Sequence, residues 1–166
     1  MIEGTRIAVE SGDLDGVIVI GGSTDDPDRQ RLRSSLPAEL AKSYLFLEKL
    51  PRQLLVNGLF PYLVSNTTAT IFVCSSRYDL VPYTVLEAAR SGLCTIVPSG
   101  GLVGASEYLP TEYQFRPTPS GLASRISALT SDDDLSLNFR PVAESIHRDT
   151  GDDAFMKAFF AHCLSA

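Results

Sequence analysis

Short apolar runs alternate along this chain with stretches whose hydrophobic residues recur at helical spacing. The unbroken runs have the length of β-strands, and the stretches between them have the length of helices. Strands are predicted at residues 16–22, 43–48, 69–76, 94–99 and 112–117, and helices at residues 5–14, 26–36, 51–66, 82–92 and 119–130. Unbroken apolar strands that alternate with helices indicate a parallel sheet covered on both faces. The pattern therefore predicts an α/β fold with an open, doubly wound parallel sheet.

Capping residues, proline and glycine mark where these helices begin and end. Thr5 is the expected N-cap of the first helix, and Asp26 followed by a proline fits the start of the second. Pro61 is expected to kink or split its helix, because proline has no N–H and its ring clashes with the preceding turn. Gly92 is expected to close the helix that precedes the fourth strand.

The final third of the chain is more polar. Residues 131–149 form a polar passage rich in helix formers. Residues 151–166 predict one further amphipathic helix, with a stripe made of Phe155, Phe159, His162 and Cys163. That stripe suits either the core or a docking surface for a partner domain. We therefore expect one domain at residues 1–150 and a C-terminal helix at 151–166 that packs on it or on a partner half.

Size and hydrophobicity fit one folded domain. The 166 residues are 44% hydrophobic, with a mean hydropathy of +0.07, which is enough for a substantial core. The formal net charge is −6, and the chain has no basic stripe of the kind that nucleic-acid backbones require, so no nucleic-acid partner is expected. It has no secretory leader pattern and no apolar run near the roughly 20 residues that span a bilayer. We expect a cytoplasmic protein.

The cysteines and histidines do not form a metal or nucleophile pattern. Cys74, Cys94 and Cys163 show no metal-ligand spacing, so buried thiols are the expectation. His147 is expected to be a surface histidine, and His162 a helix-packing one. No metal site is predicted.

The most distinctive stretch is RYDLVPYTVLEAARSGLCTIVPSGG, residues 77–101. Asp79 follows a predicted strand, and Glu87 falls in the second turn of the next helix. Ligands of open parallel sheets bind beyond the carboxyl ends of the strands, so both carboxylates can face one crevice. A carboxylate there suits two neighbouring sugar hydroxyls, and free helix N–H groups suit a phosphate. Asp79 also fits a helix cap, and Glu87 a solvated glutamate. The hypothesis of a nucleotide-sugar site therefore depends on the order of the surrounding strands, helices and glycine loop.

Residues 70–109 resemble the signature region of the retaining glycosyltransferases of family 4, also called group 1, which have the GT-B fold. Those enzymes carry a Glu, seven residues and a second Glu, then a small-residue helix end, a strand and a Gly-Gly loop. The segments GVIVIGG, YLFLEKLPRQLL, ATIFVCSSRYD and EYQFRPTPSGLASRISAL follow the family's order. The resemblance implies a Rossmann-like, nucleotide-sugar-binding domain, the C-terminal half of an enzyme that transfers a hexose to a saccharide, lipid or other acceptor.

This resemblance assigns roles to individual residues. Glu87 matches the family's second glutamate, which accepts the ribose hydroxyls of the nucleotide. Asp79 matches the first, the catalytic position that faces the transferred sugar. The backbone positions assigned to the donor sugar and its phosphates are Gly21, Gly22, Val81, Pro82, Tyr83, Thr84, Ser99, Gly100 and Gly101. The loop at residues 48–52 corresponds to a region near the base.

The resemblance also implies the partners of such a domain. Its substrate is a nucleotide sugar, and no cofactor or metal ion is expected, because basic side chains and helix dipoles meet the leaving-group charge in the family. The acceptor is bound by an N-terminal half that this chain does not contain, and that half would carry any peripheral association with a membrane. Transfer is therefore not expected from this half alone.

Three departures from the family pattern weaken this transfer of roles, and the first two are consistent with an alternative. Asp79 is one methylene shorter than glutamate, which withdraws its carboxylate by about 1 Å. Pro82 stands at a common glycine position and lacks an N–H that could bond the donor. Glu3 stands near the position where the family has a lysine that neutralises the diphosphate, so Arg6 is the cation expected near that group. The alternative is a degenerate nucleotide-sugar-binding or regulatory module without transferase activity.

Two further alternatives use a similar fold. Another reaction of a nucleotide sugar, such as epimerisation, is compatible because a fold does not determine its chemistry. Asp25 and Asp26 after the first strand suggest the acidic pocket of a flavodoxin-like signalling domain, but no matching Thr and Lys follow at the later strand ends.

Overall fold

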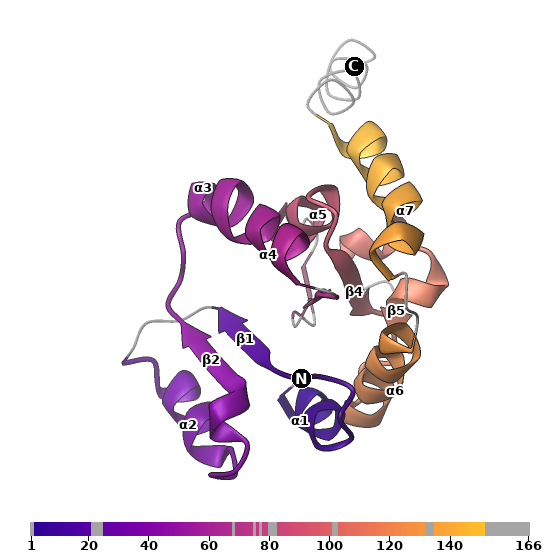
Figure 1. The fold of residues 1–166 in the computed structure, drawn as a ribbon. Helices are drawn as coiled ribbons and strands as arrows, with labels where there is room; N and C mark the ends of the chain where they lie inside the picture. The colour runs from indigo at the N-terminus through magenta and orange to yellow at the C-terminus, as the bar shows by residue number, and fades with distance from the viewer. Residues whose placement is uncertain are drawn as a thin grey trace.

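The computed structural model describes residues 2–20, 25–67, 69–74, 76, 78–79, 83–100, 103–131 and 135–151. The strands are β1 (Val17–Ile20), β2 (Tyr44–Leu47), β3 (Ile71–Val73), β4 (Cys94–Pro98) and β5 (Gln114–Phe115). The helices are α1 (Ile2–Glu10), α2 (Pro27–Ser35), α3 (Arg52–Leu54), α4 (Phe60–Asn66), α5 (Tyr83–Arg90), α6 (Pro119–Thr130) and α7 (Leu135–Thr150). Short 3₁₀ turns occur at Ala41–Ser43, Gly104–Glu107 and Thr111–Tyr113. Helices and short strands alternate along the chain (Figure 1), which confirms the predicted α/β class.

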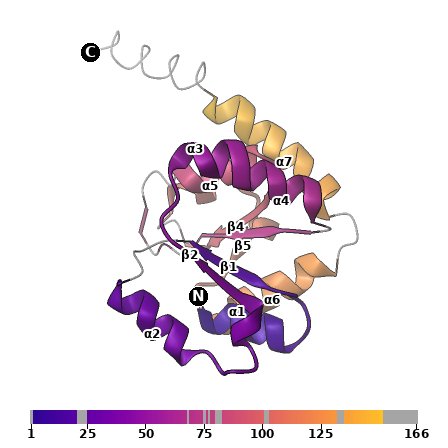
Figure 2. The ribbon, with the colours of Figure 1, turned by 60° about the vertical axis from the view of Figure 1, so that its left-hand side comes forward.

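Every strand pair is parallel, as predicted. β1 pairs with β2, with Val17 opposite Tyr44, and β4 lies between β3 and β5, with Ile71 opposite Cys94. Within the described residues these ladders form two sheets, one of two strands and one of three. Helices lie on both sides of the strands, with α1 and α6 side by side on one side and α4, α5 and α7 on the other (Figures 1 and 2).

The core is built around β4. All five of its residues are buried, which explains the continuous apolar run in the sequence, because a central parallel strand is covered on both faces. The covering side chains come from α5, α6 and α7, and they include Val85, Leu122, Ile126, Phe139 and Ile146. A smaller cluster of Phe60, Ala88 and Leu93 joins α4 to α5.

Helix α7 belongs to this core, although its sequence is a polar passage. Leu135, Phe139, Ala143 and Ile146 are buried along one stripe, at spacings of four, four and three residues that place them on one face of a helix. The ring of Phe139 meets that of Tyr113 edge-on, with centroids 4.9 Å apart. The charged residues that dominate the passage occupy the other face.

Helix α5 ends as predicted, at Gly92. This glycine has φ +89°, in the left-handed region that glycine adopts without a steric penalty. Its N–H donates to the carbonyl of Ala89, and the N–H of Leu93 donates to that of Ala88. This pair of bonds is the Schellman arrangement, and it turns the chain directly into β4.

The helical segment at residues 51–66 is interrupted just before Pro61, which agrees with the predicted kink or split. A π-helical turn at Leu55–Leu59 separates α3 from α4, and the N–H of Phe60 donates to the carbonyl of Leu55. A π turn widens the helix just before the proline, and this geometry accommodates a residue that has no N–H to donate and whose ring crowds the preceding turn.

The two predicted N-caps had different outcomes. Asp26 caps α2, because its carboxylate accepts hydrogen bonds from the N–H groups of Asp28 and Arg29, so that prediction is confirmed. The prediction for Thr5 was wrong, since α1 begins at Ile2 and Thr5 lies inside it. The Thr5 hydroxyl donates to the carbonyl of Ile2 and makes a buried hydrogen bond with Tyr44. A tertiary contact therefore replaced the capping role that the local sequence favoured.

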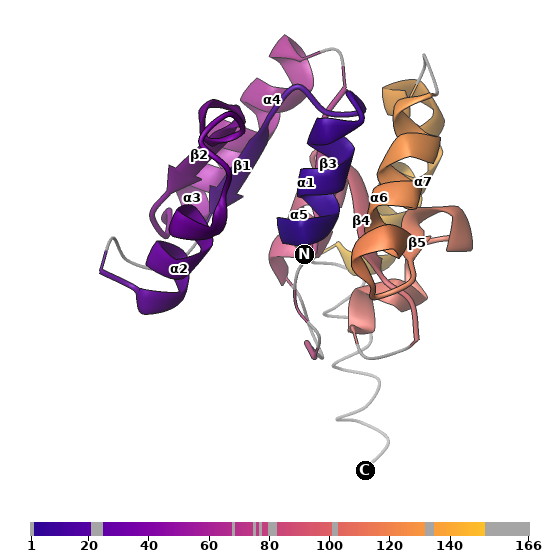
Figure 3. The same ribbon diagram turned by 90° about the horizontal axis from the view of Figure 1, so that it is seen from below.

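Helix α1 packs closely against α6, which Figure 3 shows from below. A Cβ atom placed on Gly4 would lie 2.9 Å from Leu122 and from the carbonyl oxygen of Pro119, so only glycine allows this approach. The described helices end with α7 at Thr150. The predicted amphipathic stripe of the C-terminal helix lies outside the described residues, and the division at residue 150 stays a prediction.

Candidate functional site

Glu87 lies in the second turn of α5, where the sequence places it, but on the buried face of that helix. Its neighbours Val85, Ala88 and Ala89 are buried, and the side chain of Glu87 is only 9% exposed. A carboxylate in such surroundings is stable in its charged form only with a cationic or hydrogen-bonding partner. The carboxylate of Glu87 therefore requires a cation or a hydrogen-bond donor from another part of the chain.

Arg52 is that partner. It is the first residue of α3, and its Nε–H donates to Oε1 of Glu87 across 35 residues of chain. The side chain of Arg52 is 78% exposed, so the pair joins a buried anion to a cation at the surface. The loop at residues 48–52, which the resemblance places near the base of a nucleotide, thus reaches Glu87.

The second carboxylate oxygen of Glu87, Oε2, has no partner among the described residues. The carboxylate of Glu87 makes no hydrogen bond or ion pair other than that with Arg52 in the described part of the chain. Every fully enclosed side-chain nitrogen and oxygen of the described residues has a hydrogen-bond partner. Oε2 has none, so it is not completely enclosed, although the side chain as a whole is only 9% exposed. One oxygen of this carboxylate is held by Arg52, and the other remains available as an acceptor.

Asp79 lies just beyond β3, as predicted, and is partly buried. Its backbone forms a parallel bridge with Val103, and its carbonyl accepts a hydrogen bond of 2.8 Å from the N–H of Gly104. This bridge ties together the segments that follow β3 and β4, which leave the sheet at the same edge. Asp79 is therefore on the edge where parallel sheets bind their ligands. That Asp79 and Glu87 face one crevice stays a prediction.

Cys74, at the end of β3, lies near Asp79. Burial raises the pKa of the Cys74 thiol, and the negative charge of Asp79 acts in the same direction. A thiol with a raised pKa carries little thiolate at neutral pH, which makes it a poor nucleophile. Cys74 and Cys94 are buried, as predicted, while Cys163 lies outside the described residues.

Four of the backbone positions assigned to the donor sugar and its phosphates are described. Tyr83 and Thr84 form the exposed first turn of α5, where helix N–H groups have no partner within the helix. The N–H of Ser99 donates to the carbonyl of Phe115 at 2.8 Å, and Gly100 has φ +108°. The remaining assigned positions, Gly21, Gly22, Val81, Pro82 and Gly101, lie outside the described residues.

Arg6, the cation expected near a diphosphate, is engaged within its own helix. Its guanidinium donates to Glu3 at 3.0 Å and to Glu10 at 2.7 Å. The hydrogen bond from Arg6 lowers the pKa of Glu3 and raises that of Arg6. A phosphate would have to displace two carboxylates to reach this side chain.

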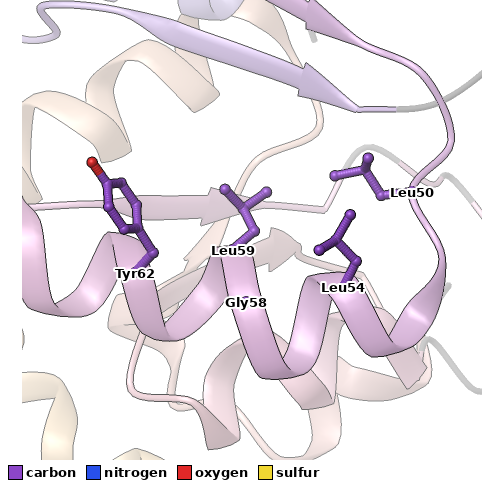
Figure 4. A pocket seen from close by; sticks show the side chains of 5 residues that line it. All are labelled: Leu50, Leu54, Gly58, Leu59 and Tyr62. Atoms are coloured by element: carbon purple, nitrogen blue, oxygen red, sulfur yellow. The ribbon is translucent and has the colours of Figure 1, made fainter.

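An apolar hollow of about 400 Å³ follows the helical segment that begins with α3. Its side chains project to one side of the helix (Figure 4), and it is lined by Leu50, Leu54, Gly58, Leu59 and Tyr62. Leu54 follows Arg52 by two positions, which is about 200° around a helix. The hollow and the Glu87 contact therefore lie on opposite sides of α3, and the hollow is separate from the site around Glu87.

A second hollow, of about 520 Å³, lies between the C-terminal end of α5 and α7. There the Nε–H of Arg90 donates to Nδ1 of His147 at 3.3 Å. His147 is exposed, as predicted, whereas His162 lies outside the described residues. The end of α5 adjoins the start of β4, so this hollow is at the opposite edge of the sheet from Asp79.

The described ranges contain no candidate metal-ligand cluster and no candidate membrane-spanning helix. No group of three or more His, Cys, Asp or Glu side chains there could hold a metal ion. No helix in those ranges has the length and apolar character needed to cross a membrane.

Comparison with known protein families and with characterised proteins gave no match to this chain. The glycosyltransferase resemblance therefore rests on the residues quoted above.

The pairing of Arg52 with Glu87 was not predicted from the sequence. A signal for it exists, because Glu87 falls within the otherwise apolar run Val85–Ala89 of this helix, and a carboxylate buried among such neighbours requires a cation. Which cation supplies the charge depends on contacts across 35 residues, and the spacing of residues does not contain that information.

Proposed function

We propose that this chain binds a nucleotide sugar, as the donor-binding half of a retaining glycosyltransferase. The observation that carries the proposal is the state of Glu87, a buried carboxylate with Oε1 held by Arg52 and with Oε2 not engaged by any described residue. A ribose hydroxyl can donate to Oε2, and a hydrogen bond to a charged acceptor is stronger than one between neutral groups. The position matches the residue that accepts ribose hydroxyls in the family that the sequence resembles.

The proposal includes a Rossmann-like arrangement of the two sheets. The observed pairs fit one open sheet in the order β2-β1-β3-β4-β5, with β1 and β3 as neighbours. The common parallel direction of the pairs and the helices on both sides support this order (Figure 2). The strand order of such a sheet reverses between β1 and β3, which is where ligands bind. Asp79 follows β3, and Gly21 follows β1.

In the proposed complex, each element of this edge contacts one part of the donor. The first turn of α5, at Tyr83 and Thr84, faces the diphosphate, because the N-terminus of a helix favours negative charge. Asp79 faces the sugar. During transfer, the bond between the anomeric carbon and the phosphate oxygen breaks, and the nucleoside diphosphate leaves with the electron pair. The acceptor oxygen forms the new bond to that carbon and gives its proton to the leaving phosphate. The acceptor is bound by the partner half.

A binding module without transferase activity is the second candidate, and the contacts of Arg6 favour it. This side chain is the nearby cation for a leaving diphosphate, and it is already paired with Glu3 and Glu10. Transfer requires stabilisation of the charge that develops on the leaving group. Without a further cation from the partner half, the site would bind a nucleotide sugar and not cleave it.

Ligand-observed NMR of the chain with UDP, GDP, ADP and their sugar derivatives tests the proposal. We expect one of these nucleotides to bind, and Glu87→Gln to weaken it by about 1–3 kcal/mol, roughly 5- to 150-fold, because a charged acceptor is lost. Wild-type affinity in Glu87→Gln would refute the assignment of Glu87, and the absence of binding by every nucleotide would refute the function.

A matched control separates this effect from a general loss of negative charge. Glu144 on α7 also pairs with an arginine, Arg140, at 3.2 Å, but its side chain is exposed. Glu144→Gln should bind nucleotide as the wild type does. Glu87→Gln should remain folded, because it leaves an exposed arginine without a partner rather than a buried charge, and circular dichroism checks this.

A further inference from the structure

The contact between Arg52 and Glu87 presents a donor and an acceptor side by side. Arg52 uses only Nε–H for this contact, and its two terminal nitrogens make no hydrogen bond within the described part of the chain. A guanidinium carries five N–H donors in a planar fork, so several remain available at the exposed end of the side chain. Oε2 of Glu87, which has no partner in the described part of the chain, is an acceptor beside them.

We propose that Arg52 is a specificity-determining residue, and that the two neighbouring hydroxyls of a ribose are bound by different side chains. One hydroxyl donates to Oε2 of Glu87, and the oxygen of the other accepts from a terminal N–H of Arg52. This inference rests on the proposed function, because it concerns the ribose of the same nucleotide. It differs from the expectation in which Glu87 alone accepts both hydroxyls.

The occupation of Oε1 is the reason for this division. A carboxylate that accepts two neighbouring hydroxyls offers one oxygen to each, and here the second hydroxyl would have to share Oε1 with Arg52. Breaking that contact would leave Glu87, which is 9% exposed, without a cation in an apolar setting, and that is costly. Binding that keeps the pair intact leaves Oε2 as the unshared acceptor on Glu87 and the terminal donors on Arg52, and each hydroxyl can satisfy one of them.

The experiment compares the ribose, 2′-deoxyribose and 3′-deoxyribose forms of the nucleoside diphosphate that binds the wild type best. Dissociation constants are measured for the wild type, Glu87→Gln and Arg52→Met. We expect the wild type to bind the ribose form about 10-fold or more tightly than either deoxy form, since each loses a hydrogen bond to a charged group. Glu87→Gln should lose the preference against one deoxy form, and Arg52→Met the preference against the other.

The outcomes distinguish this inference from the proposed function. A wild type that binds the nucleotide without preferring ribose refutes both the assignment of Glu87 to the ribose and the role of Arg52. If the wild type prefers ribose through Glu87 while Arg52→Met keeps both preferences, only the role of Arg52 is refuted, because Glu87 alone then accounts for both hydroxyls. Equal weakening of all three ligands by Arg52→Met indicates a purely structural role and also refutes it.

Arg52→Lys keeps the test decisive if Arg52→Met does not fold. The ammonium group of lysine still neutralises Glu87, but it lacks the planar fork that reaches two groups at once. We expect this variant to keep the wild-type melting temperature and to lose the same single preference. Arg140→Met removes a comparable arginine from an exposed ion pair on α7, and it should leave all three affinities unchanged.

Discussion

Replacing Phe139 with alanine should destabilise the fold strongly, because this ring is the largest that α7 contributes to the core. Phe139 is fully buried, and it meets Tyr113 edge-on at 4.9 Å with an interplanar angle of 79°. Truncation of a buried phenylalanine to alanine costs about 3–5 kcal/mol. The lost contact with Tyr113 accounts for about 0.5–1.5 kcal/mol of this cost. We expect a total near 4 kcal/mol, a large part of the roughly 5–15 kcal/mol that stabilises a domain.

Urea denaturation followed by circular dichroism measures this loss. Leu137→Ala is the matched control, since Leu137 lies two positions away in the same helix but is 61% exposed, and its truncation should change the free energy of unfolding by less than about 0.5 kcal/mol. Thermal melts should show a decrease of about 8–16 °C for Phe139→Ala. Similar, small losses for the two variants would mean that α7 does not cover β4, and the placement of this helix would be wrong.

Two further predictions concern the backbone and the buried thiol. Gly92→Ala should lower the free energy of unfolding by about 1–2 kcal/mol, because the backbone φ at this position is +89°. Steric contact adds little, since the new methyl group would meet only Val64, at 3.9 Å. Gly92→Asn should cost less, and urea titrations that show no loss of stability in the alanine variant would contradict this backbone conformation. The raised pKa of Cys74 means that the unfolded thiol ionises first, so stability should fall as the pH rises above about 9, by at most about 1.4 kcal/mol per unit. Cys74→Ala should remove that slope between pH 9 and 10, and an unchanged slope would assign it to other groups.

The elements that the sequence predicted correctly are those with strong local signals. The apolar runs at β1, β2 and β4 and the helix ends at Asp26 and Gly92 depend on neighbouring residues only. Backbone sterics, capping and the burial of an unbroken strand act over a few positions, so they are visible in a short stretch of sequence.

The features that the sequence did not predict depend on distant contacts. Thr5 has the side chain of a cap, but its hydrogen bond to Tyr44, 39 positions away, places it inside α1. The buried stripe of α7 was hidden by the charged residues around it. The binding role assigned to Glu87 stays a prediction, and its partner Arg52 could not be identified, because only the folded chain brings α3 against α5.

The π-helical turn at Leu55–Leu59 sets the angle at which Arg52 leaves the helix. Phe60, on one side of this turn, is anchored in the core against Phe72, while Arg52, on the other side, is anchored on Glu87. A π turn accommodates about one residue more than an α turn, so winding these five residues as ordinary α-helix would rotate Arg52 by roughly 100° relative to Phe60. The guanidinium would then point away from Glu87. The winding of a turn that does not itself contact Glu87 thus determines whether the carboxylate has its cation.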